Sequence, residues 1–164
     1  FLANLDASGL PPERLKIELT ENAIKRDMEV IVPKLRALRK AGIRIAIDDF
    51  GTGYSSLAYL QHFPVNTLKI DRSFVGDIRA DLGDASIINA IVAMARGLKL
   101  DIIAEGVETR TQLQYLKSQG CSEVQGYMFS RPLPAPEFVA LLSREPFVRL
   151  VMATTENEAV ASTV

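Results

Sequence analysis

Acidic side chains recur at the ends of the β-rich segments of this chain. They are Glu18 and Glu21, Asp48 and Asp49, Asp71, and Glu105 and Glu108, with Lys69 and Gln125 among them. Carboxylate oxygens are the ligands that hard divalent cations such as Mg²⁺ and Mn²⁺ prefer, so the pattern indicates a metal-dependent site. The alternative is a structural network of ion pairs, because an unpaired buried charge is very costly.

The adjacent pair Asp48 and Asp49 is informative by itself. Neighbouring residues of a regular strand point to opposite faces, so both carboxylates serve one site only if the chain departs from strand geometry there. The following Gly51-Thr52-Gly53 permits such a departure. The alternative interpretation is a plain turn followed by a helix N-cap.

Lys69 lies between two apolar residues, Leu68 and Ile70, and we expect it to point inward. A buried lysine needs anionic partners, which the aspartates can provide. It would then activate a water or neutralise a phosphate oxygen. The alternative is a salt bridge that only holds the aspartate pair in place.

The remaining sequence narrows the chemistry. There is no GxxxxGK(S/T) loop and no GxGxxG motif, which argues against nucleotide-binding folds of those types. His62 is the only histidine and Cys121 the only cysteine, so a histidine base is excluded and zinc is disfavoured. A net charge of −1 argues against binding of a nucleic-acid polymer. No apolar run approaches the ~20 residues of a membrane span, so we expect no membrane contact by this segment.

The elements that would position these residues alternate between strand and helix. The predicted strands are Lys16–Leu19, Arg44–Asp49, Thr67–Asp71, Asp101–Glu105 and Glu123–Phe129, and the predicted helices are Asp27–Ala41, Asp84–Leu98, Thr109–Gln119 and Pro136–Ser143. This alternation predicts a parallel α/β sheet whose carboxyl edge carries the site. An open doubly wound sheet and part of a barrel both fit, although a complete barrel takes ~250 residues.

Five motifs, in order, resemble the signature of EAL domains. They are Glu18–Glu21, Asp48–Leu57, Leu68–Asp71, Ala104–Glu108 and Gln125–Tyr127, with Pro64–Asn66 and Arg131–Pro134 in agreement. The resemblance covers residues 1–147 and leaves 148–164 as a C-terminal tail or linker. It implies an α/β fold that is part of a modified (β/α)8 TIM-type barrel, with about five βα units.

The resemblance also implies a function, which is metal-dependent hydrolysis of cyclic dimeric GMP to the linear dinucleotide. It matches Glu18, Asp48 and Asp49 to ligands of Mg²⁺ or Mn²⁺. It matches Lys69 and Glu105, with Asp49, to residues that act on the attacking water, and Glu105 alternatively to a residue of the metal site. It matches Asp71, Gln125 and Pro132 to the substrate site. It matches Glu21 to the residue that steadies a loop coupling the metal site to dimerisation, formed by Phe50, Gly51, Thr52, Gly53, Tyr54, Ser55 and Ser56. It implies a bacterial signalling protein in the cytoplasm, with cyclic di-GMP as ligand, a homodimer, and sensory or GGDEF domains in a parent protein that can be membrane-anchored.

One departure from the family pattern bears on activity. The Glu-Ala-Leu tripeptide and an asparagine ligand of the family lie upstream of the residues present, together with about three strands of the barrel. We therefore expect this chain alone not to be a competent enzyme. A catalytically inactive receptor for the dinucleotide, or a regulatory interaction module, remains the alternative function.

Overall fold

The computed structural model describes residues 1–52, 60, 63–78 and 86–143, apart from the side chains of residues 25 and 26. The chain forms two compact units, Phe1–Met128 and Phe129–Val164. The first contains the entire sheet. In the second, the described residues 129–143 contain one helix, α8 (Ala135–Leu142). The expected tail 148–164 lies outside the described residues and stays a prediction.

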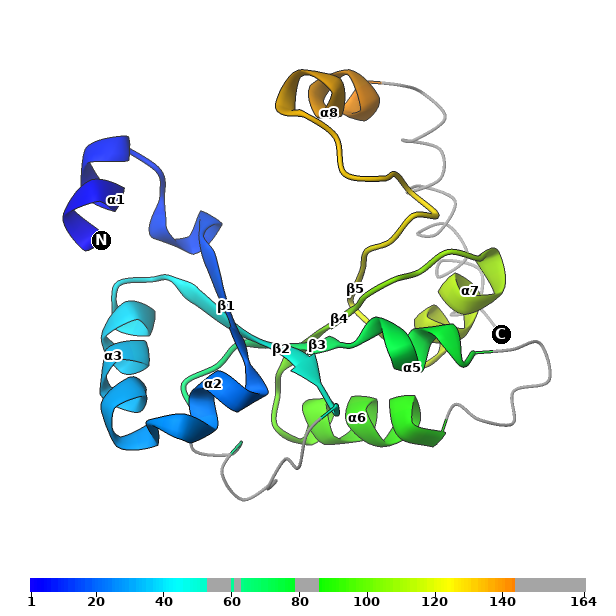
Figure 1. Cartoon of the computed structure of the whole chain (residues 1–164), viewed down its shortest axis with the longest axis horizontal. Coiled ribbons are helices and arrows are strands. Elements are labelled where there is room, and N and C mark those ends of the chain that lie inside the picture. Colours follow the sequence, from blue (N-terminus) through cyan, green and yellow to red (C-terminus); the bar gives the residue numbers. More distant parts are fainter. Residues whose placement is uncertain (53–59, 61–62, 79–85, 144–164) are drawn as a thin grey trace, which may run out of the picture. The chain divides into compact units, whose positions relative to one another are not determined.

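The first unit is built on a parallel sheet whose strands stand in sequence order (Figure 1). The strands are β1 (Lys16–Thr20), β2 (Arg44–Phe50), β3 (Thr67–Ile70), β4 (Asp101–Ala104) and β5 (Glu123–Val124). A doubly wound sheet reverses its strand order at a switch point, whereas a barrel adds each strand beside the previous one. The consecutive order therefore favours the barrel over the doubly wound alternative.

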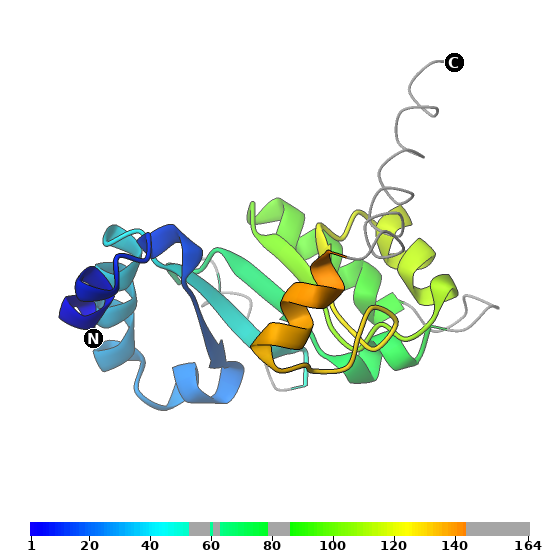
Figure 2. The same ribbon diagram turned by 90° about the horizontal axis from the view of Figure 1, so that it is seen from above.

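A first helix precedes β1, and further helices follow the strands. They are α1 (Leu2–Ser8), α2 (Glu21–Arg26), α3 (Met28–Lys40), α5 (Arg72–Gly76), α6 (Ser86–Gly97) and α7 (Arg110–Ser118), with a 3-10 turn at Pro12–Arg14. Helix α2 contacts β1 and β2, α3 contacts β2, and α6 contacts β3 and β4 (Figures 1 and 2). Among the described residues, none of these helices has both the length and the apolar character that crossing a membrane requires.

The two faces of the sheet differ in character. On one face the strands bury Ile45, Ile47, Leu68, Ile70 and Ile102, each at most 3% exposed. The register places Lys16, Glu18, Arg44, Asp48, Lys69, Asp101 and Glu123 on the opposite face, which we call the polar face. The apolar face thus provides the burial that stabilises the fold, while the polar face is left for ionic chemistry.

Ion pairs at the amino ends of the strands cross the polar face. Lys16 of β1 contacts Glu123 of β5 at 3.5 Å (Nζ to Oε2), and Arg44 of β2 contacts Asp101 of β4. The edge strands of a flat five-stranded sheet would lie about 19 Å apart, which is too far for the first contact. The sheet is therefore curled toward its polar face, as a barrel wall must be.

The predicted elements agree with this fold except at their ends. The fifth strand was expected over Glu123–Phe129, but β5 stops at Val124, so Gln125 follows the strand instead of lying within it. The chain turns there because Gly126 passes against the backbone of Val107, whose carbonyl accepts the Met128 amide at 3.0 Å. The short helices α1, α2 and α5 were not predicted, since five to seven residues are too few to show a helical period.

Candidate active site

Lys69 is the centre of the site. Its Nζ lies 2.6 Å from Glu18 Oε2, 2.8 Å from Asp48 Oδ1 and 2.7 Å from Glu105 Oε1, and its side chain is 5% exposed. Burial by itself lowers the pKa of Lys69, but the hydrogen bonds to Asp48, Glu105 and Glu18 outweigh it and raise the pKa above the usual lysine value. Lys69 is therefore a fixed positive charge that joins β1, β2 and the segment after β4.

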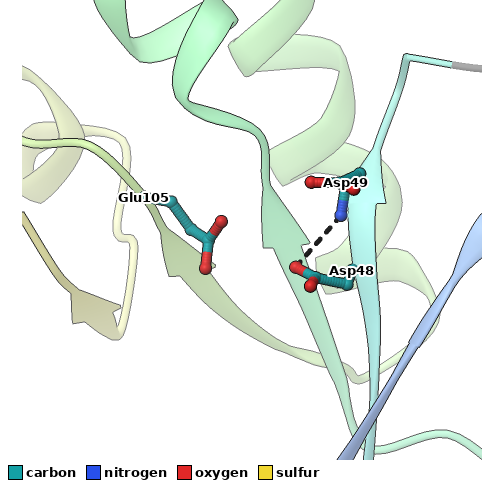
Figure 3. Close-up of side chains that lie close together, drawn as sticks. All are labelled: Asp48, Asp49 and Glu105. Carbon is teal, nitrogen blue, oxygen red and sulfur yellow. Dashed lines mark hydrogen bonds between the residues drawn. The ribbon is translucent and has the colours of Figure 1, made fainter.

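A β-bulge brings Asp48 and Asp49 to the same site. Between Ile47 and Phe50 the register of β2 against β3 shifts by one residue, and Asp49 adopts a φ of 52°. Asparagine and aspartate tolerate this left-handed conformation better than most residues. The Asp49 amide donates to Asp48 Oδ1 at 3.1 Å (Figure 3). The sequence analysis expected a departure from strand geometry at this pair, and the structure places it at Asp49.

Three carboxylates converge next to this bulge. Asp48, Asp49 and Glu105 each offer an oxygen, and these oxygens all lie within 4.8 Å of one another (Figure 3). An all-oxygen, anionic donor set suits a hard divalent cation such as Mg²⁺ or Mn²⁺. The residues present therefore fit a metal of that class. Glu18, which we expected to be a ligand, is not in this cluster, and its Oε2 lies 2.6 Å from Lys69 Nζ.

The pKa values of two neighbouring acids are pushed apart. Burial, followed by the negative charges of Asp48 and Asp71, raises the pKa of Asp49, and Lys69 only partly opposes this. Burial also acts to raise the pKa of Asp71, but hydrogen bonds from Ser73 and from the backbone outweigh it and lower the pKa. Asp71 is the N-cap of α5 and accepts the Ser73 amide at 2.9 Å. A cation beside Asp49 would relieve the repulsion that raises its pKa.

Glu105 is held by the segment that follows β5. Gln125 Nε2 donates to Glu105 Oε1 at 2.6 Å, and backbone bonds tie the two segments together. The Gln125 amide donates to the Ala104 carbonyl at 2.9 Å, and the Val107 amide donates to the Gln125 carbonyl at 3.0 Å. The glutamine is thus a fixed neighbour of the carboxylate.

The remaining expected site residues are distributed as follows. Glu21 is buried at the start of α2, and Phe50 is buried at the end of β2. Gly51 has a φ of 98°, and Thr52 Oγ1 donates to the Asp49 carbonyl at 2.9 Å. Gly53, Tyr54, Ser55 and Ser56 lie outside the described residues, so the expected coupling of this loop to dimerisation stays a prediction. Pro132 belongs to the second unit, and its expected place in the substrate site also stays a prediction.

Gln112 is a buried polar residue that the sequence analysis did not single out. It lies in the first turn of α7 and forms a capping box with Thr109. Thr109-Arg110-Thr111-Gln112 fits the pattern of serine or threonine followed three residues later by glutamate or glutamine, so the signal was present in the sequence.

Comparison with known proteins identifies relatives of named function. The sequence pattern that defines the EAL domain matches residues 1–132. The chain is 48% identical over 145 residues to the cyclic di-GMP phosphodiesterase NbdA of Pseudomonas aeruginosa, covering 88% of this chain and 18% of that protein. The chain spans about a fifth of the length of the curated relatives that it matches first.

Solved structures agree with the sequence match. The PaMucR phosphodiesterase in complex with c-di-GMP superposes with a TM-score of 0.78 at 44% identity, covering 84% of this chain and 56% of that one. A manganese and cy-diGMP complex of Klebsiella pneumoniae BlrP1 gives 0.71 at 38% identity, covering 80% and 33%. The fold, with its consecutive parallel strands, is that of a TIM-type barrel wall. This chain belongs to the EAL-domain family.

Proposed function

We propose that this chain contributes the catalytic face of a metal-dependent cyclic di-GMP phosphodiesterase. The observation that carries the proposal is the convergence of Asp48, Asp49 and Glu105 beside the buried ammonium of Lys69. The relatives support it, because NbdA is named as a phosphodiesterase and the PaMucR structure holds the dinucleotide.

Asp48, Asp49 and Glu105 are the residues that would hold the metal, with Glu18 as a further candidate ligand. The BlrP1 complex with manganese supports a divalent cation, and we propose Mg²⁺ or Mn²⁺. When bound, such a cation polarises a phosphodiester and makes a nearby water more acidic. The remaining chemistry falls to the side chains of the chain itself.

Lys69 and Glu105 divide the work on the attacking water. Because the pKa of Lys69 is raised, the lysine keeps its proton and serves to orient the water or to neutralise negative charge on the phosphate. The alternative to a ligand role for Glu105 is that it accepts the proton of the water, with Asp48 and Asp49 then holding the metal. Both Lys69 Nζ and Gln125 Nε2 contact Glu105 Oε1, which fixes the rotation of the carboxylate.

Several properties of the whole protein belong to the same proposal. We expect a homodimer in the bacterial cytoplasm, with sensory or GGDEF domains elsewhere in the parent protein. Asp71, Gln125 and Pro132 are proposed to contact the dinucleotide. The curated relatives are about five times longer than the region they share with this chain, which leaves room for such domains in them.

The test is an assay of cyclic di-GMP hydrolysis with excess Mn²⁺. It compares residues 1–164 with the same residues extended upstream, and it includes Asp48→Asn beside the exposed control Asp6→Asn. We expect turnover by the extended protein, none by its folded Asp48→Asn variant, and normal turnover by the control. Near-normal turnover by Asp48→Asn at limiting metal would refute the assignment. Binding without turnover by the extended protein would favour the receptor function.

A further inference from the structure

The segment 105–109, which begins with Glu105, is fastened to helix α5 through Gln112. The Gln112 side chain is 7% exposed and uses both ends of its amide. Its Oε1 accepts the Glu108 amide at 2.8 Å and the Thr109 amide at 2.9 Å. Its Nε2 donates at 3.2 Å to the Val75 carbonyl of α5.

A second contact places the same segment along α5. Gly106 has a φ of 72°, and a Cβ there would lie 2.5 Å from Arg72 Cβ. The segment therefore touches α5 near its first residue through Gly106 and near its end through Gln112. Helix α5 begins directly after Asp71, its N-cap, so both contacts relate the segment after β4 to the segment after β3.

The opposite side of the segment is packed just as closely. A Cβ on Gly126 would lie 2.1 Å from the Val107 carbonyl oxygen, and Val107 is fully buried. The segment is thus enclosed between α5 and the chain after β5. The contacts at Gly106 and Gly126 depend on the absence of a side chain. The bond from Gln112 to Val75 is made by a side chain, so it can be removed by substitution without altering the backbone.

We infer that Gln112 is a positioning residue, which sets the place of Glu105 by joining the segment after β4 to α5. The expected effect of Gln112 on catalysis rests on the proposed function, whereas its expected effect on the position of Glu105 does not. Partners that are hydrogen-bonded directly to metal ligands typically change affinity or activity by about 10- to 100-fold when they are removed. Gln112 acts one step further from Glu105, through Glu108 and Thr109, so we expect an effect at the low end of that range.

Two substitutions test the acceptor and the donor of the Gln112 side-chain amide separately. Gln112→Glu keeps an acceptor for the Glu108 and Thr109 amides, and glutamate suits this capping-box position, but it cannot donate to the Val75 carbonyl. Gln112→Met removes both functions at similar volume. Gln114→Met is the matched control, because Gln114 is an exposed glutamine on the same helix.

The geometric test uses nuclear magnetic resonance of the chain without substrate. The side-chain amide of Gln125 reports on Glu105, because it donates to that carboxylate. We expect its signal to shift and its hydrogen exchange to speed up in both Gln112 variants and to be unchanged in Gln114→Met. We expect the backbone amides of Glu108 and Thr109 to lose protection only in Gln112→Met. An unchanged Gln125 signal in a folded Gln112→Glu variant would overturn the inference.

The kinetic test uses the upstream-extended protein. Gln112→Glu should lower kcat about tenfold and change KM less than twofold, because the fold and the ligands remain. Wild-type kcat in that variant, when wild type itself hydrolyses cyclic di-GMP, would also overturn the inference. If wild type shows no hydrolysis, the proposed function fails, and the Gln125 signal still decides whether Gln112 positions Glu105.

Discussion

At the scale of single residues, the charge at the site is unbalanced. Four carboxylates, Glu18, Asp48, Asp49 and Glu105, lie around the one ammonium of Lys69 in the described part of the site. Asp49 is the member with the raised pKa and is not among the carboxylates that contact Lys69. Its charge is therefore the one whose removal should relieve most repulsion in the metal-free protein.

We predict that Asp49→Asn stabilises the metal-free chain at pH 7. Asparagine is suited to the φ of 52° and removes the repulsion by Asp48 and Asp71. The gain should be below about 1 kcal/mol, because the side chain is partly solvated. Urea unfolding at a series of pH values measures it.

The dependence on pH follows from the direction of the shift. The pKa of Asp49 is raised in the folded state, so this residue favours folding fully when it is protonated, below the unfolded pKa of ~3.9. That contribution to the free energy of unfolding is lost as the pH rises through the folded pKa. The advantage of Asp49→Asn should thus be full at pH 7 and vanish below pH ~4. Added Mn²⁺ should stabilise the wild type more than the variant. A variant less stable than wild type at pH 7 without metal would contradict the prediction.

Cys121 provides a test at a site away from the catalytic residues. Burial raises the pKa of its thiol to about 11, and the opposing charge of Arg96 is the smaller effect. At pH 8 only about one thiol in a thousand is then ionised, and the thiolate is the reactive form. We predict that iodoacetamide modifies Cys121 at least about a hundredfold more slowly in the folded chain than in urea. Equal rates would show an exposed thiol of ordinary pKa.

At the scale of elements, the close approach of the segments after β4 and β5 depends on Gly126. A Cβ there would lie 2.1 Å from the Val107 carbonyl oxygen and 2.3 Å from its amide nitrogen, and backbone atoms cannot move aside cheaply. We predict that Gly126→Ala destabilises the fold by about 2–3 kcal/mol in urea unfolding.

The matched control is Gly97→Ala in the last turn of α6. Nothing lies within 4 Å of a Cβ at Gly97, and its φ is not positive. Alanine should stabilise this helical position by about 0.5–1 kcal/mol, because it loses less backbone entropy on folding. If Gly126→Ala and Gly97→Ala had the same free energy of unfolding, the close contact with Val107 would not restrict the side chain at position 126.

The elements also show what the sequence could predict. Strands such as β2 and β4 were located correctly, because short runs of Ile and Ala bounded by charged residues are typical of buried strands. The alternation by itself fits two sheet topologies, so the consecutive order of a barrel was predicted only through the resemblance to EAL domains. The convergence of Asp48 with Asp49 depends on a bulge at one residue, and no periodicity in the sequence predicts which residue takes a positive φ.

Part of the candidate site could also be predicted from the sequence. Lys69 was expected among acidic partners because a lysine between two apolar residues of a buried strand needs them, and the structure places three carboxylates around it. Which carboxylates cluster together was not predictable, because Glu18 and Glu105 occupy similar positions at strand ends in the sequence. The resemblance allowed Glu105 to be either a base or a metal-site residue, and the geometry places it in the cluster with Asp48 and Asp49.

At the scale of the whole sheet, the ion pair between Lys16 and Glu123 links the first and last strands. We predict that Lys16→Glu lowers the free energy of unfolding by about 1 kcal/mol and that Lys16→Glu/Glu123→Lys restores it. The effect should shrink in 1 M salt, because the pair is partly exposed. The exposed Lys34→Glu serves as the control. Failure of the double variant to recover would mean that the two side chains do not interact in solution.

The consecutive order of the strands has a consequence for the way the chain is made. Each of the strands β2 to β5 pairs with the strand that precedes it in the sequence, so a partner is already present when it emerges. Ribosomes add about 5–20 residues per second, and domains tend to fold from the amino terminus as they emerge. One strand and its helix can therefore dock on the growing sheet at a time, whereas Lys69 meets its last carboxylate, Glu105, only after β4 has emerged. During synthesis, the ion cluster is completed after most of the sheet that carries it.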